Sequence, residues 1–424
     1  VFIGYDSGGG GWTGTLSQKN VAIGNGTMTG AMNDGSENAA VGYQALNALT
    51  TGDLNTAIGH QAGLVFTTGF GNVFLGHSAG LATVDSDKCT ILGYRAAAVG
   101  NLAAGAGDGT GADGTVAVGN QALLNLTEGI GNVAVGYQAL DAAATSDYNT
   151  AVGHQSLSAV NSDGNGQNTA VGYNAGLLIN SGIGNTTIGN QSGNALTSTN
   201  YNTFIGHDSG GSAAGCNYSV AIGQSTFGDG VASADGSIAI GREALKNLAA
   251  ATGNVAIGYQ ALDAVTSGGH NIAIGYLAAD SVLGGFDSNI AIGTNAMGGS
   301  HTGTASAQNV AIGGDAMAGA LNDADNNVAV GYIALQALTT AIDSVAIGHM
   351  AGAGVTTGGN QVFIGKSAGA VHTTGGNNVA IGTNAMDDTD AGSTSLGSTG
   401  NIFVGSNAGG GTWANLASNY NVGI

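Results

Sequence analysis

The chain has 424 residues, including 80 Gly and no Pro, and its formal net charge is -20. Six basic residues against 26 acids argue against a phosphate backbone or an anionic membrane as a partner. A hydrophobic content of 43% is enough to build a core, which argues against a disordered chain.

One motif organises the sequence from end to end. It reads NVAVGYQAL at Asn132 to Leu140. Indexed on its glycine, here Gly136, it occurs in 24 copies, the last truncated at Gly423, and 13 of the 23 intervals are 17 residues long. A fixed short period is typical of a solenoid, in which each repeat buries its apolar face by stacking on its neighbours. We expect one all-β domain over residues 1–424, a parallel β-solenoid of about 24 coils and roughly 110 Å at ~4.8 Å per coil.

Each position of the motif, counted from its glycine, predicts a structural role. Position -4 is Asn in 17 of 23 copies, and stacked amides such as that of Asn132 can form a hydrogen-bonded ladder. Position -1 is always Ile, Val or Leu, so Val135 is expected in the core. Gly136 permits a bend. Position +3 is always Ala, Ser or Thr, so Ala139 is expected to meet a close neighbour.

The residues at positions -2 and +4 compensate in size. All five copies with Phe at -2 carry Gly at +4, whereas most copies with Ala at -2 carry a bulky residue there, such as Leu140 opposite Ala134. Interiors tolerate neither voids nor overlap, so the two side chains are expected to share one pocket. Ala57, Ala170 and Ala346 lie opposite Gly and are exceptions.

Along each copy, the segment from -4 to -1 predicts a short β-strand because it is rich in β-branched residues. Residues +1 to +5 predict a second strand or a tight arc, and the rest carry turn residues. Two strands and two turns per coil are expected. A helix is the alternative for residues 120–129 and 242–253, where apolar residues have helical spacing.

Length variation falls almost entirely between position +5 of one copy and -5 of the next. The longest intervals predict inserted loops near residues 98–114 and 387–400, which should project from one side of the solenoid. The chain begins and ends inside a motif copy, so we expect it to be a fragment of a longer fibre protein.

The strand sequences SVAIG (Ser219 to Gly223) and NVAIG (Asn254 to Gly258) resemble the head repeats of YadA-type trimeric autotransporter adhesins. The longer unit TGNVAIGYQALDA (Thr252 to Ala264) also resembles repeats of phage and marine-bacterial tail-fibre proteins. This resemblance implies a left-handed parallel β-roll and a parallel homotrimeric rod. The period of 17 exceeds that of the usual adhesin head, and no stalk, membrane barrel or chaperone domain is present in the sequence.

Candidate chemical sites are sparse. His60, His77, His154, His207 and His349 share position +1, but only His60 and His77 occupy consecutive copies, so a half-exposed rim is favoured over a metal ladder. Asp-rich turns, such as residues 108–113, leave scattered Ca²⁺ sites open as an alternative, and no cofactor is expected otherwise. No catalytic constellation recurs, so no enzyme activity is expected.

The two tryptophans, Trp12 and Trp413, both follow Gly-rich runs at position +8. They are candidate receptor or glycan contacts, and packing over the glycines is the alternative. Cys89 and Cys216 are about seven copies apart, too far for a disulfide within the chain.

The sequence thus predicts an extracellular structural and adhesive shaft. A phage tail fibre on the virion is the first hypothesis, and the head of a bacterial cell-surface trimeric adhesin is the second. A monomeric β-solenoid enzyme or ice-binding protein is the third. The expected partners are further copies of the chain and a host-surface receptor or glycan, with no nucleic acid and no membrane insertion by this segment.

Overall fold

The fold is an all-β, parallel β-solenoid with a period near 17 residues, as predicted. A computed structural model describes residues 1–11, 17–98, 112–161, 164–228, 234–281, 284–301, 306–387, 397–410 and 419–424, and this part of the chain contains no α-helix. Most of the two predicted loops, residues 99–111 and 388–396, lies outside the described residues. The chain forms two compact units, Val1–Asp208 and Ser209–Ile424.

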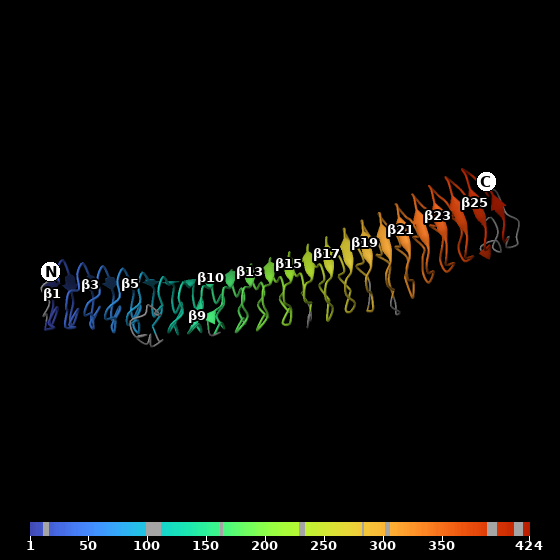
Figure 1. Cartoon of the computed structure of the whole chain (residues 1–424). Helices are drawn as coiled ribbons and strands as arrows, with labels where there is room; N and C mark the ends of the chain where they lie inside the picture. Colours follow the sequence, from blue (N-terminus) through green and yellow to red (C-terminus); the bar gives the residue numbers. More distant parts are fainter. Residues whose placement is uncertain are drawn as a thin grey trace. The chain divides into compact units, whose positions relative to one another are not determined.

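In the first unit, twelve strands pair in parallel, each with the next one along the chain, and lie side by side (Figure 1). They are β1 (Phe2–Ile3), β2 (Val21–Ile23), β3 (Ala39–Val41), β4 (Thr56–Ile58), β5 (Val73–Leu75), β6 (Thr90–Leu92), β7 (Val116–Val118), β8 (Val133–Val135), β10 (Thr150–Val152), β12 (Thr169–Val171), β13 (Thr186–Ile188) and β14 (Thr203–Ile205). A separate small pair joins β9 (Ser146–Asp147) and β11 (Gly164–Asn165).

The second unit repeats this ladder with twelve strands. They are β15 (Val220–Ile222), β16 (Ile238–Ile240), β17 (Val255–Ile257), β18 (Ile272–Ile274), β19 (Ile290–Ile292), β20 (Val310–Ile312), β21 (Val328–Val330), β22 (Val345–Ile347), β23 (Val362–Ile364), β24 (Val379–Ile381), β25 (Ile402–Val404) and β26 (Val422–Gly423). From first to last strand, each unit makes eleven turns of the solenoid, which gives 22 in all.

The register keeps every motif position in its own column, with one correction at the end of the chain. Ala151 pairs with Ala134 on one side and with Ala170 on the other, all at position -2. Gly423 pairs with Phe403, which is also a -2 residue. The prediction that Gly423 is the bending glycine of the last copy is therefore wrong, because the register makes it a -2 residue.

The bend after each strand is built from left-handed backbone. Gly136 has φ 141°, and a Cβ there would overlap the carbonyl group of Gly153 in the next coil. Positions +2 and +4 also have positive φ, as at Gln138 (51°) and Leu140 (52°). Such values exclude both a second strand and a helix. Each regular coil therefore has one strand, not two, and Leu123 (50°) and Leu245 (52°) contradict the helical alternative.

The interior of the coil differs from the predicted one in two columns. Asn132, Ala139 and Leu140 are buried as expected, whereas Val135 and Gly136 are only partly buried. Position -1 faces outward, because -4 and -2 already point inward and side chains alternate along a strand. The prediction that Val135 lies in the core of its own chain is therefore wrong. Position +7 supplies core residues that were not predicted, including Leu49 and Phe66.

The shared pocket of positions -2 and +4 is confirmed. A Cβ added at Gly369 would lie 2.7 Å from the ring of Phe363 in the same coil. The structure also explains the exceptions with Ala opposite Gly. At Gly63, the added Cβ would meet Leu46 of the preceding coil at 2.9 Å and Phe74 of the following coil at 3.0 Å. The size compensation therefore extends to neighbouring coils as well as within one.

Candidate functional site

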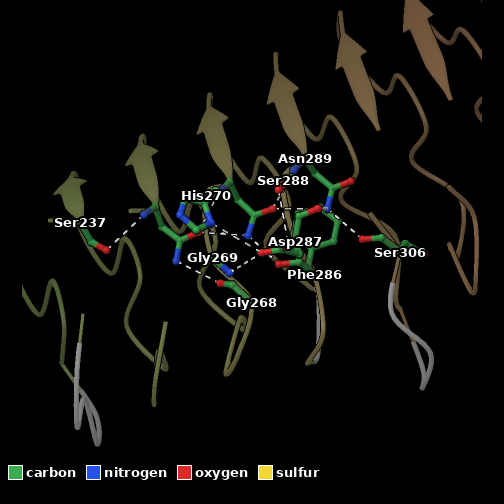
Figure 2. A network of polar contacts seen from close by, with 11 residues as sticks. Ser237, Gly268, Gly269, His270, Phe286, Asp287, Ser288, Asn289 and Ser306 are labelled. Atoms are coloured by element: carbon green, nitrogen blue, oxygen red, sulfur yellow. Dashed lines mark hydrogen bonds and ion pairs between the residues drawn. The ribbon is translucent and has the colours of Figure 1, made fainter. Parts of the chain in front are cut away.

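The most regular polar feature of the molecule is the buried Asn ladder at position -4, drawn for part of the second unit in Figure 2. Asn271 donates from its backbone N and from Nδ2 to Oδ1 of Asn254, both at 3.0 Å. Its Nδ2 also donates to the Phe286 carbonyl at 2.6 Å. Asn289 repeats the pattern one coil further. Each amide thus bonds the coils on both sides, and this ladder is a structural element rather than a binding site.

Where the ladder lacks Asn, the substitute retains part of the bonding. The backbone N of Cys89 donates to Oδ1 of Asn72 at 2.8 Å, and its Sγ donates to the Ala112 carbonyl at 3.0 Å. Ser219 donates to the Ala234 carbonyl at 2.8 Å. Cys89 and Cys216 are both buried, and burial raises the pKa of each thiol to about 12. A buried thiol of this kind is a poor nucleophile.

A second regular surface is the outer strand face, defined as the first and third residues of the 22 three-residue strands. These residues are Val, Ile, Leu or Thr, with one Ala, and every one of them is at least partly exposed. Ile58, Leu75 and Ile347 are 40 to 42% exposed. The face carries no charged residue, although the chain has a net charge of -20. On each unit, an exposed apolar surface of this kind is typical of interaction sites.

Beside this face, position +1 forms a column of stacked, half-exposed rings. The ring centroids of Tyr43 and His60 are 5.0 Å apart, those of His60 and His77 are 4.7 Å apart, and those of His77 and Tyr94 are 5.3 Å apart. A second stack contains Tyr137, His154 and Tyr173. The predicted rim position is confirmed. His60 is stacked between Tyr43 and His77, so the edge of its ring is the part most available to a ligand.

Aspartates six residues before the glycine support the turns. Oδ1 of Asp147 accepts a hydrogen bond from the backbone N of Ile130 in the preceding coil at 2.8 Å. Oδ1 of Asp287 accepts a hydrogen bond from the backbone N of Gly269 at 3.0 Å, and it lies 3.9 Å from Nδ1 of His270 (Figure 2). Of the Asp-rich turn at 108–113, only its last two residues are described. Burial, followed by the nearby charge of Asp87, raises the pKa of Asp113.

An open acidic pocket lies on the first unit, lined by Asp34, Ser36, Glu37, Asp53 and Leu54. Two of its three carboxylates, those of Glu37 and Asp53, have described partners. Glu37 forms an ion pair with Lys19 at 2.7 Å, and Asp53 accepts the backbone N of Ser36 at 2.6 Å. Among the described residues, no group of three or more His, Cys, Asp or Glu side chains could hold a metal ion.

The predicted glycan contacts Trp12 and Trp413 lie outside the described residues. Neither a protein-family model nor a curated protein matches the sequence. Within the described ranges, no helix is long and apolar enough to span a bilayer. The parallel strand ladder places the chain in the structural class of parallel β-solenoid repeat proteins.

Proposed function

We propose that this chain is the shaft of an extracellular structural and adhesive fibre, and that it acts as a parallel homotrimer. The observation that carries the proposal is the uncharged outer strand face. An acidic protein that leaves a continuous apolar ribbon exposed would aggregate unless a partner covered it.

A further copy of the same chain is the partner that fits best. The ribbon repeats once per coil at about 4.8 Å, and a parallel second copy has the same step along its whole length. Eleven turns give each unit roughly 500 Å² of ribbon. This area is of the same order as the about 800 Å² per partner that a standard stable interface buries. Three chains, and the left-handed winding, are implied by the resemblance to trimeric adhesin heads and tail fibres.

The test is the mass in solution. Light scattering under native conditions should give about three times the single-chain mass of 40.7 kDa. Ile347→Glu places a charge on the outer strand face and should reduce the mass towards that of one chain. His349→Glu adds the same charge to the exposed +1 column of the same coil and should leave the assembly intact. A wild-type mass near 40.7 kDa would overturn the homotrimer.

A phage tail fibre is the first candidate role, and the head of a cell-surface adhesin is the second. Both would present receptor- or glycan-binding surfaces away from a virion or a cell. The glycan contact assigned to Trp12 and Trp413 stays a prediction. Alanine substitution of both, followed by glycan-array binding, tests it, and unchanged binding would remove it.

An ice-binding solenoid is favoured by one specific observation in the first unit. In four consecutive strands, β10 and β12 to β14, the first outer residue is Thr and the third is Val or Ile. In the second unit this first residue is always Val or Ile. Thermal hysteresis measured on the wild-type protein decides this alternative, because a structural fibre shaft should show none.

A further inference from the structure

His372 is a fully buried histidine in the +7 core column of the second unit. The two preceding coils place Leu338 and Val355 in this column, and all three side chains are 0% exposed. The His372 ring meets the Phe363 ring edge-on, with centroids 6.1 Å apart. An ionisable ring therefore replaces an aliphatic side chain in the core.

The polar contacts of His372 suit only its neutral form. Nε2 lies 2.9 Å from the Gly375 carbonyl and 3.1 Å from Nδ2 of Asn378 in the Asn ladder. Nδ1 is buried without a hydrogen-bond partner in the described part of the chain. A protonated ring would present two N–H donors. The donor at Nδ1 would stay unpaired in the core, whereas the donor at Nε2 can bond the Gly375 carbonyl. Leaving a buried charged donor unpaired is costly.

No counter-charge offsets this cost among the described contacts of the ring. The described contacts are with Phe363 in β23, with Gly375 in the turn that follows His372, and with Asn378 just before β24, and none of these residues is titratable. Lys366, a charged residue of the same coil, is exposed in the outward +1 column. Burial lowers the pKa of His372, and the hydrogen bond to Gly375 opposes this only in part.

We propose that His372 makes the coil between β23 and β24 open locally when the solution is acidified. In the opened coil the ring reaches water and takes up a proton, whereas in the closed coil it stays neutral. The open form therefore binds more protons, and its population rises as the pH falls below the ordinary histidine value of 6.5. The opening constant should rise by up to about tenfold per pH unit until the pKa of the closed coil is reached.

A second buried histidine in the same unit shows why this device is local. His301 is 3% exposed, and its Nδ1 and Nε2 lie 3.0 Å and 3.1 Å from the carbonyl oxygens of Leu321 and Met297. Both ring nitrogens can donate to a carbonyl group there. A proton on His301 therefore leaves no donor unpaired, and its coil is expected to stay closed on acidification.

Hydrogen exchange of the intact protein at pH 7.5 and pH 5, corrected for intrinsic rates, tests the proposal. Peptides that cover 361–381 should lose about tenfold or more of their protection at pH 5. Peptides that cover β17 and β18, and those around His301, should not. His372→Leu restores the core residue found at Leu338 and should abolish the loss. His349→Gln removes an exposed histidine from the neighbouring coil and should preserve it.

Two results would overturn the proposal. One is equal acid sensitivity of 361–381 and of β17 and β18 in the wild-type protein, a comparison that does not depend on any variant folding. The other is an unchanged acid response in a folded His372→Leu protein.

Discussion

The ring of Phe363 occupies the place that a β-carbon at Gly369 would need, 2.7 Å away. Gly369 also has φ 60°, which disfavours a side chain independently of the space. Gly369→Ala should therefore destabilise this region by about 2 kcal/mol, a usual value for overpacking. The double variant Phe363→Ala with Gly369→Leu recreates the Ala134 and Leu140 combination. It should recover most of the loss in denaturant unfolding, and a double variant no more stable than Gly369→Ala would contradict the shared pocket.

Removing one amide from the Asn ladder should weaken the coils on both sides. Nδ2 of Asn55 donates to Oδ1 of Asn38 and to the Gly69 carbonyl, and its Oδ1 accepts from Asn72. Asn55→Ala leaves several buried groups unpaired and should cost about 2 to 4 kcal/mol. Asn55→Ser should cost less, because Ser219 and Ser344 already fill this column.

Local unfolding free energies from native-state hydrogen exchange are the suitable measure, because repeat arrays need not unfold in one step. Asn190→Ala, in the exposed +1 column, is the control and should change stability by less than about 0.5 kcal/mol. Equal effects of Asn55→Ala and Asn190→Ala would refute the structural role of the ladder.

Cys89 should be inert in the folded protein and should weaken it at high pH. Burial raises the pKa of the Cys89 thiol from 9.0 to about 12, so the thiol keeps its proton in the folded protein. The stabilisation is present below pH 9 and is lost as the pH rises towards 12. Native protein at pH 8 should react far more slowly with a thiol reagent than urea-unfolded protein. Cys89→Ser, which keeps a donor in the ladder, should reduce the alkaline loss of stability. Rapid labelling of native Cys89 would show that the thiol is accessible.

The stacked histidines should not form a strong metal site. His60 and His77 are flanked by Tyr43 and Tyr94 in their column, and their rings lie face to face. A structural zinc site needs four ligands in a tetrahedral arrangement. Calorimetric titration with Zn²⁺ should show no saturable binding that depends on these residues. Binding that disappears in His60→Gln, but not in His349→Gln, would contradict this expectation.

The repeat made the columns of the solenoid predictable, but not the direction in which each column faces. Asn132, Ala139 and Leu140 have the predicted environments because their size and chemistry are constrained at every copy. The position of Val135 is equally uniform in residue type, yet its side chain faces outward. A strand that is buried on both faces and a strand with one exposed apolar face can have the same apolar sequence, so the pattern does not distinguish them. A constant residue type at one position of the repeat therefore does not reveal whether its side chain faces the core or the outside.

The backbone of the bend was also hidden from pattern reasoning. Leucine seldom adopts positive φ, so nothing in the sequence marks Leu140 at 52°. The helical spacing of apolar residues in NQALLNLTEG instead suggested a helix, and positions +1 to +5 suggested a second strand or a tight arc. The Gly423 error has a simpler cause, because the short ending NVGI fits the motif in two frames and only the pairing with Phe403 distinguishes them.

The shared register of Ala134, Ala151 and Ala170 has a genetic consequence. If one whole coil were deleted, the strands on either side would meet with the same residues opposite each other, and a duplicated coil would fit equally well. Unequal crossing-over between repeats in the gene can thus change the reach of the protein in steps of one coil without a new core having to evolve.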